Sequence, residues 1–97
     1  MSVLPSNDPK TTILPKRRDF SYNTVGRELV VHDSGSGRVH FLNATASVIW
    51  QCCDGETTLD RCEQRIRDAF ALDESTDLAG DIRDALVDFA ERGLIEA

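Results

Sequence analysis

Residues 38–55 read RVHFLNATASVIWQCCDG, and this stretch decides the fold. Its opening residues alternate in the way that is typical of a β-strand. Val39 and Phe41 share one face of that strand, because successive side chains point to opposite sides. The other face carries Arg38, His40 and Leu42. Nothing in the stretch is a catalytic constellation, so we expect the function to lie at the strand's edge.

The spacing of the apolar residues then changes from the two-residue period of a strand to the 3.6-residue period of a helix. Asn43 is a good N-cap, because its side-chain oxygen can accept hydrogen bonds from the amides of the first turn. A helix is predicted over residues 44–53, with an apolar stripe that includes Trp50, the only tryptophan. Gly55 fits the position just past its end. The stretch therefore predicts a strand-to-helix corner that builds a small core.

Two further strands are predicted upstream of this corner. Residues 20–23 alternate ring and polar side chains, and residues 28–32 carry β-branched residues at their centre. Gly26-Arg27 is a predicted turn, and the DSGSG run at residues 33–37 has strong turn chemistry. The expected product is a three-stranded antiparallel sheet. Its third strand has a free side unless a helix or tail covers it.

Two more helices are predicted downstream. The first begins after Thr57 or Thr58 and runs to about Phe70, and the second spans residues 77–92 and ends at Gly93. The residues after it are predicted to pack back as a short extended tail. The predicted buried faces comprise Leu59, Cys62, Ile66, Ala69, Phe70, Leu78, Ile82, Ala85, Leu86 and Phe89. Three strands followed by three helices predict an α+β fold, naturally interpreted as a winged helix-turn-helix.

The remainder of the chain is predicted to be an N-terminal arm. Residues 1–18 hold all three prolines and are expected to be flexible, with a short extended piece at residues 11–14, ahead of a domain over residues 19–97. The chain has no apolar run of membrane-spanning length and no signal-peptide pattern, so we expect a cytoplasmic protein without a membrane partner. Its net charge of −6 opposes nucleic-acid binding.

The sequence offers no catalytic site and no cofactor motif. An odd cysteine count with two adjacent members is not a disulfide framework, so Cys52, Cys53 and Cys62 are expected to be reduced and to pack as small apolar groups. A metal site would need His32 or His40 to reach across the fold. Both histidines are instead expected on the strand surface. We therefore predict a protein that is not an enzyme.

The order of these motifs resembles that of a known family. The run LNATASVIW at residues 42–50, followed by Asp54-Gly55, is similar to the PqqD family of peptide chaperones. These are also called precursor-peptide recognition elements of ribosomally made, modified peptides. An acidic linker at residues 72–74 and the Gly-Leu-Ile ending at residues 93–95 fit the same pattern. The resemblance covers residues 20–97.

The resemblance implies a winged helix-turn-helix domain that binds the leader of a precursor peptide. The leader would add as a strand beside the third strand, bordered by the third helix, and be delivered to a modifying enzyme such as a radical-SAM enzyme, a cyclase or a protease. PQQ biosynthesis, a lasso-peptide pathway and another modified-peptide pathway all stay open. The expected peptide-binding residues are Arg38, Val39, His40, Phe41, Leu42, Asp81, Arg83, Asp84, Leu86 and Asp88.

Three questions stay open from the sequence alone. On a helical wheel the aspartates at positions 77, 81, 84 and 88 form an acidic ridge, while the opposite flank carries Arg83 and Leu86, and either flank could line the cleft. The alternative function is a winged-helix DNA-binding regulator, which the acidic third helix disfavours. Exchange of the arm between protomers would give a homodimer.

Overall fold

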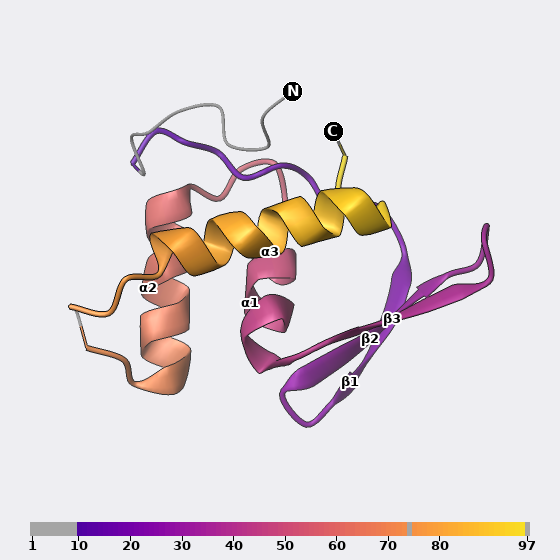
Figure 1. Cartoon of the computed structure of the whole chain (residues 1–97), viewed down its shortest axis with the longest axis horizontal. Helices are drawn as coiled ribbons and strands as arrows, with labels where there is room; N and C mark the ends of the chain where they lie inside the picture. The colour runs from indigo at the N-terminus through magenta and orange to yellow at the C-terminus, as the bar shows by residue number, and fades with distance from the viewer. Residues whose placement is uncertain (1–9, 74, 97) are drawn as a thin grey trace.

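The computed structural model describes residues 10–73 and 75–96 of the chain. Three strands come first, and three helices follow them (Figure 1). The strands are β1 (Ser21–Val25), β2 (Glu28–Asp33) and β3 (Arg38–Leu42), and the helices are α1 (Ala44–Cys52), α2 (Leu59–Phe70) and α3 (Ala79–Arg92). The predicted α+β fold is confirmed. The helix-turn-helix relation of the last two helices stays a prediction.

The sheet is an antiparallel meander in the order β1-β2-β3. The register pairs Tyr22 with Val31, and Val31 in turn with His40, so these three side chains share one face of the sheet. That inner face turns toward α1, and the sheet extends away from the helices (Figure 1). The outer face carries Val39 and Phe41, which are 47% and 73% exposed.

The predicted caps of α1 and α2 and the predicted end of α3 are confirmed, whereas α1 ends one residue earlier than predicted and α3 begins two residues later, at Ala79. The Asn43 side chain accepts a hydrogen bond from the amide of Ala46 at 2.8 Å, which caps α1. Thr58 caps α2, because its hydroxyl accepts from the amide of Arg61 at 3.3 Å. Gly93 ends α3 with a φ of 73°, a conformation that glycine adopts without steric strain. In the described ranges, no helix is long and apolar enough to cross a lipid bilayer.

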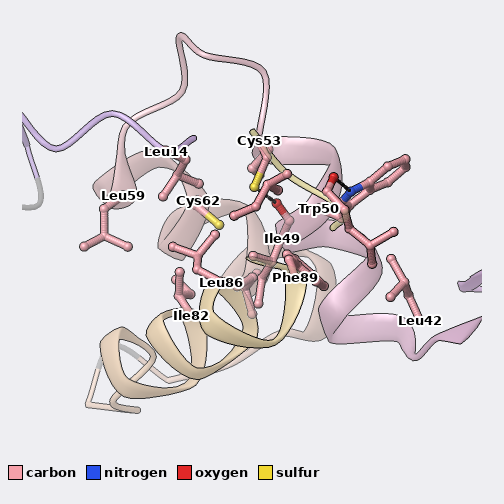
Figure 2. Packing of buried hydrophobic residues seen from close by; sticks show 14 of the residues in the cluster. Leu14, Leu42, Ile49, Trp50, Cys53, Leu59, Cys62, Ile82, Leu86 and Phe89 are labelled. Carbon is pink, nitrogen blue, oxygen red and sulfur yellow. Dashed lines mark hydrogen bonds between the residues drawn. The ribbon is translucent and has the colours of Figure 1, made fainter. Parts of the chain in front are cut away.

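The core lies where α1, α2 and α3 meet, and it continues onto the inner face of the sheet. Figure 2 shows side chains from all three helices and from the N-terminal segment pointing into it. The predicted buried faces of α2 and α3 are largely confirmed: Leu59, Cys62, Ile66, Leu78, Ile82, Leu86 and Phe89 are buried. Ala69 is exposed, so its predicted burial is wrong. It lies in the last turn of α2.

The described part of the predicted arm packs against the domain, which corrects the expectation for residues 10–18. The amide of Leu14 donates to the carbonyl of Thr57 at 2.9 Å, and the amide of Leu59 donates to that of Thr12 at 2.8 Å. Leu14 and Thr12 are both 1% exposed. Further along, Arg17 pairs with the C-terminal tail at Ile95. Residues 1–9 lie outside the described residues.

Leu14 is therefore expected to matter for stability. Replacing Leu14 with Ala should lower the free energy of unfolding by about 3 kcal/mol, because a buried leucine is lost and a cavity is left. Urea denaturation followed by circular dichroism measures this. Ile13→Ala is the matched control, since Ile13 is 42% exposed and its loss should change stability by less than about 1 kcal/mol. Equal effects of the two variants would contradict the packing of this segment.

The C-terminal tail closes the core, as predicted. Leu94 and Ile95 are 0% and 4% exposed. The carbonyl of Leu94 accepts a hydrogen bond from the indole Nε1 of Trp50 at 3.0 Å (Figure 2). It also accepts one from the amide of Arg18 at 3.0 Å. The tail thus ties the N-terminal segment to α1.

Candidate functional site

Strand β3 forms one edge of the sheet. Within the described ranges its only strand partner is β2. Helix α3 does not cover it, because no Cα atom of α3 lies within 8 Å of a Cα atom of β3. An uncovered edge strand presents backbone N–H and C=O groups that another extended chain can pair with.

The hairpin between β1 and β2 determines which backbone groups face this edge. The two-residue turn at residues 26–27 makes Val25 and Glu28 the closing pair. In an antiparallel sheet, the backbone groups of successive residues point alternately to the two neighbouring strands. Glu28 therefore faces β1, whereas Leu29 and Val31 turn their backbone groups toward β3.

The same alternation continues onto β3. The register places His40 opposite Val31 and Leu42 opposite Leu29, so His40 and Leu42 bond to β2. The N–H and C=O groups of Val39 and Phe41 consequently point to the open edge. Two residues thus offer a guest strand their donors and acceptors.

The β3 side chains divide between the two faces. Val39 and Phe41 project from the outer face, away from the helices, and Arg38 at the start of the strand is exposed. Leu42 is buried at 3% exposure and belongs to the core. An outward aromatic ring beside an open edge offers apolar contact to the alternate side chains of an added strand.

His40 does not lie on the surface, so the prediction for this residue is wrong. Its side chain is 9% exposed, because the register places it on the inner face beside Val31. Its Nε2 atom is buried and, in the part of the chain that the structure describes, has no hydrogen-bond partner. His32, on the outer face, is half-buried and lies 3.4 Å from the side-chain amide of Asn23.

A hollow of about 420 Å³ begins where β3 ends. It lies between the first turns of α1 and one flank of α3. Its lining residues are Asn43, Thr45, Ala46, Ile49, Asp81, Asp84, Ala85, Asp88 and Phe89. Asn43 and Thr45 are not among the residues that the sequence predicts for the site. Their only sequence signal is their position directly after the edge strand.

The structure brings three of the predicted α3 residues together in this hollow. Asp81 and Asp84 are exposed, and Asp88 accepts from the guanidinium of Arg92 at 3.2 Å. Arg83 and Leu86 do not line it. Leu86 is fully buried in the core, because it lies on the helix stripe that faces α1 and α2. The acidic flank, not the flank with Arg83, therefore lies beside the end of β3.

The three cysteines are free in the structure, and their predicted burial is confirmed. A hydrogen bond from the Cys62 thiol, helped by the guanidinium of Arg65, lowers the pKa of Cys52 to about 7. The same hydrogen bond, together with burial, raises the pKa of Cys62. Burial raises the pKa of Cys53 to about 12. In the described ranges, no group of three or more His, Cys, Asp or Glu side chains could hold a metal ion.

These features define a class of protein: a small α+β domain with an uncovered strand edge that leads into an acidic hollow. A family model described as coenzyme PQQ synthesis protein D (PqqD) matches residues 28–95, from the start of β2 to the C-terminal tail. The match covers more than half of the chain, which therefore belongs to the PqqD family. Comparisons with curated proteins and with solved structures found no match.

Family membership confirms the resemblance noted in the sequence. It makes the chain an accessory protein of PQQ biosynthesis or of the biosynthesis of another ribosomally made, modified peptide.

Proposed function

We propose that this protein is a non-catalytic chaperone for a precursor peptide. It captures the leader segment by strand addition to β3 and presents it to a modifying enzyme, such as a radical-SAM enzyme, a cyclase or a protease. The observation that carries the proposal is the uncovered edge of β3, where the backbone groups of Val39 and Phe41 point outward. Family membership supports the class of pathway.

The leader adds antiparallel to β3. Its residues opposite Val39 and Phe41 form the hydrogen-bonded pairs, and their side chains lie on the outer face beside these two apolar groups. Its residues opposite His40 and Leu42 turn inward. Because an antiparallel guest runs N to C against β3, its N-terminal part lies beside Asn43, where the hollow begins.

The hollow gives the site its charge preference. The carboxylates of Asp81, Asp84 and Asp88 line it, so a Lys or Arg in the N-terminal part of the leader is attracted there. The long stem of such a side chain can pack on Ala85 and Phe89 while its charged end reaches the carboxylates. The same carboxylates repel phosphates, which disfavours DNA as the partner of α3.

Reversing two of these charges should weaken binding of a basic leader. Asp81→Lys combined with Asp84→Lys is expected to raise the dissociation constant about tenfold at low ionic strength, because exposed ion pairs each contribute up to about 1 kcal/mol. The difference should shrink as salt is added, since salt screens exposed charges. Isothermal titration across a salt series measures both effects.

The matched control carries the same change in net charge outside the hollow. Glu56→Lys combined with Glu91→Lys alters two exposed carboxylates, neither of which lines it. This control should bind the leader nearly as well as the unmodified protein. Equal weakening in both double variants would show that the effect comes from net charge alone. Unchanged affinity of the Asp81→Lys, Asp84→Lys variant at every salt concentration would remove the hollow from the site.

The function itself is tested by titrating the chain with its precursor peptide in two forms, complete and without the leader. The complete peptide should bind and the leaderless form should not. Isotope-edited NMR of the complex should shift the amides of Val39 and Phe41 most strongly within the sheet. Tight binding of the leaderless peptide would overturn the proposal.

A further inference from the structure

His40 carries a buried polar atom that the described part of the chain does not satisfy. Its side chain is nine-tenths buried, and among the described residues nothing hydrogen-bonds to its Nε2 atom. A buried polar group without a partner keeps its full desolvation cost, so the folded state gains when a partner is supplied. Arg67 Nε is also buried and unpaired, but the Arg67 guanidinium donates to the carbonyl of Thr76 at 3.1 Å and lies 3.8 Å from Glu63. His40 lacks such an anchor at Nε2.

The position of His40 points to the missing partner. On the inner face of the sheet, the register lines it up with Val31 and, one strand further, with Tyr22. The next member of this row, beyond His40, would come from a strand added at the open edge. Because the backbone groups of His40 bond to β2, that residue would form a non-hydrogen-bonded pair with it. In such pairs the Cα atoms are only about 4.5 Å apart and the side chains are closest.

We infer that His40 selects leaders with a hydrogen-bonding side chain at the position opposite it, namely a hydroxyl or a carboxamide. This inference rests on the proposed strand addition. Ser, Thr, Asn and Gln side chains can both donate and accept, so they satisfy Nε2 in either tautomer of the imidazole. An apolar guest side chain at this position would leave Nε2 buried without a partner.

The neighbouring leader residues have the opposite preference. They lie on the outer face, where Val39 and Phe41 are exposed. The recognised segment is therefore apolar-polar-apolar, with its polar side chain facing inward. This pattern reverses that of an ordinary amphipathic strand, whose apolar side chains face the core, and it gives the site a selectivity that main-chain pairing cannot supply.

A random peptide library displayed on phage tests the inference without knowledge of the natural leader. Selections are run in parallel on the full chain and on Val39→Pro, which removes an outward amide of β3. Peptides enriched only on the unmodified chain are the β3 binders, and we expect them to share the apolar-polar-apolar pattern. The absence of any such peptide would overturn strand addition, and the inference with it.

A double-mutant cycle then isolates His40. In one enriched peptide the inward polar residue is replaced by Val, which should weaken binding to the unmodified chain about tenfold. The same replacement should have little effect on His40→Phe, which has no ring nitrogen to leave unpaired. His40→Gln keeps hydrogen-bonding atoms, so it should restore the preference for the polar peptide. It is also the variant to measure if His40→Phe does not fold.

His32→Phe is the matched control, because the chain's other histidine lies on the outer face of β2. It should retain the full preference. If β3 binders are found but show no polar preference, or if the preference survives in His40→Phe, then His40 does not select the leader, and strand addition itself still stands.

Discussion

The variant Val39→Pro should bind the leader about 100-fold more weakly than the unmodified protein. Proline removes one of the outward N–H donors of β3, and its ring occupies the space that a guest strand must enter. A lost hydrogen bond that leaves its buried partner unpaired costs up to about 3 kcal/mol, which corresponds to about this factor in the dissociation constant. Isothermal titration with the complete precursor peptide measures it.

The other edge of the sheet supplies the control for this experiment. Backbone groups alternate in direction along a strand, and those of Val25 point toward β2. The amide of Thr24 therefore faces outward from β1. Thr24→Pro therefore introduces the same ring at an equivalent position of the opposite edge. It should leave leader binding within about twofold of the unmodified value, whereas both proline variants should keep their helical circular dichroism. Normal binding by Val39→Pro, or an equal loss in both variants, would show that the leader does not add to β3.

The sequence predicts most of the fold because its signals are local. Asn43 and Thr58 cap their helices through bonds to amides three residues ahead, and Gly93 ends α3 through its own backbone conformation. Such interactions depend on near neighbours in the chain, so a pattern can reveal them. The positions of the three strands follow in the same way from alternation and turn residues.

The N-terminal segment shows where such reasoning fails. Prolines and polar residues around Leu14 indicate a loose arm, yet the segment hydrogen-bonds to Thr57, Cys53 and Leu94. These partners lie about 35 to 75 residues further along the chain, so no local sequence pattern indicates the contacts. The segment is ordered by tertiary pairing with a loop and a tail, which a reading of neighbouring residues does not detect.

The site was predictable to a similar degree. The edge strand and the acidic ridge follow from the sequence patterns. The patterns do not show which face of the strand is buried. Alternation groups His40 with Leu42, and Leu42 must reach the core because it leads into α1. His40 is therefore carried inside, while the more apolar Phe41 is left exposed. Propensity alone would have placed the aromatic ring in the core, and tertiary context decides otherwise.

Replacing Trp50 with Ala should have the largest effect on stability. The indole is fully buried, packs edge-on against Tyr22 with ring centroids 5.5 Å apart, and lies under the guanidinium of Arg17 at 5.7 Å. Together with its bond to Leu94, it joins β1, the N-terminal segment and the C-terminal tail to α1. A loss of about 3–5 kcal/mol is expected, a large part of the roughly 5–15 kcal/mol of a typical domain.

Urea denaturation followed by far-ultraviolet circular dichroism is the right measurement, because the variant lacks the chain's only tryptophan fluorophore. Trp50→Phe separates packing from hydrogen bonding. It should lose about 1–2 kcal/mol, since the Leu94 carbonyl still accepts from the amide of Arg18. Phe41→Ala, which truncates an exposed ring, should change stability by less than about 0.5 kcal/mol. If Trp50→Ala were as mild as Phe41→Ala, the indole could not be the group that holds the sheet and both chain ends to α1. The edge of β3 would then have to be positioned by the strand-to-helix corner alone.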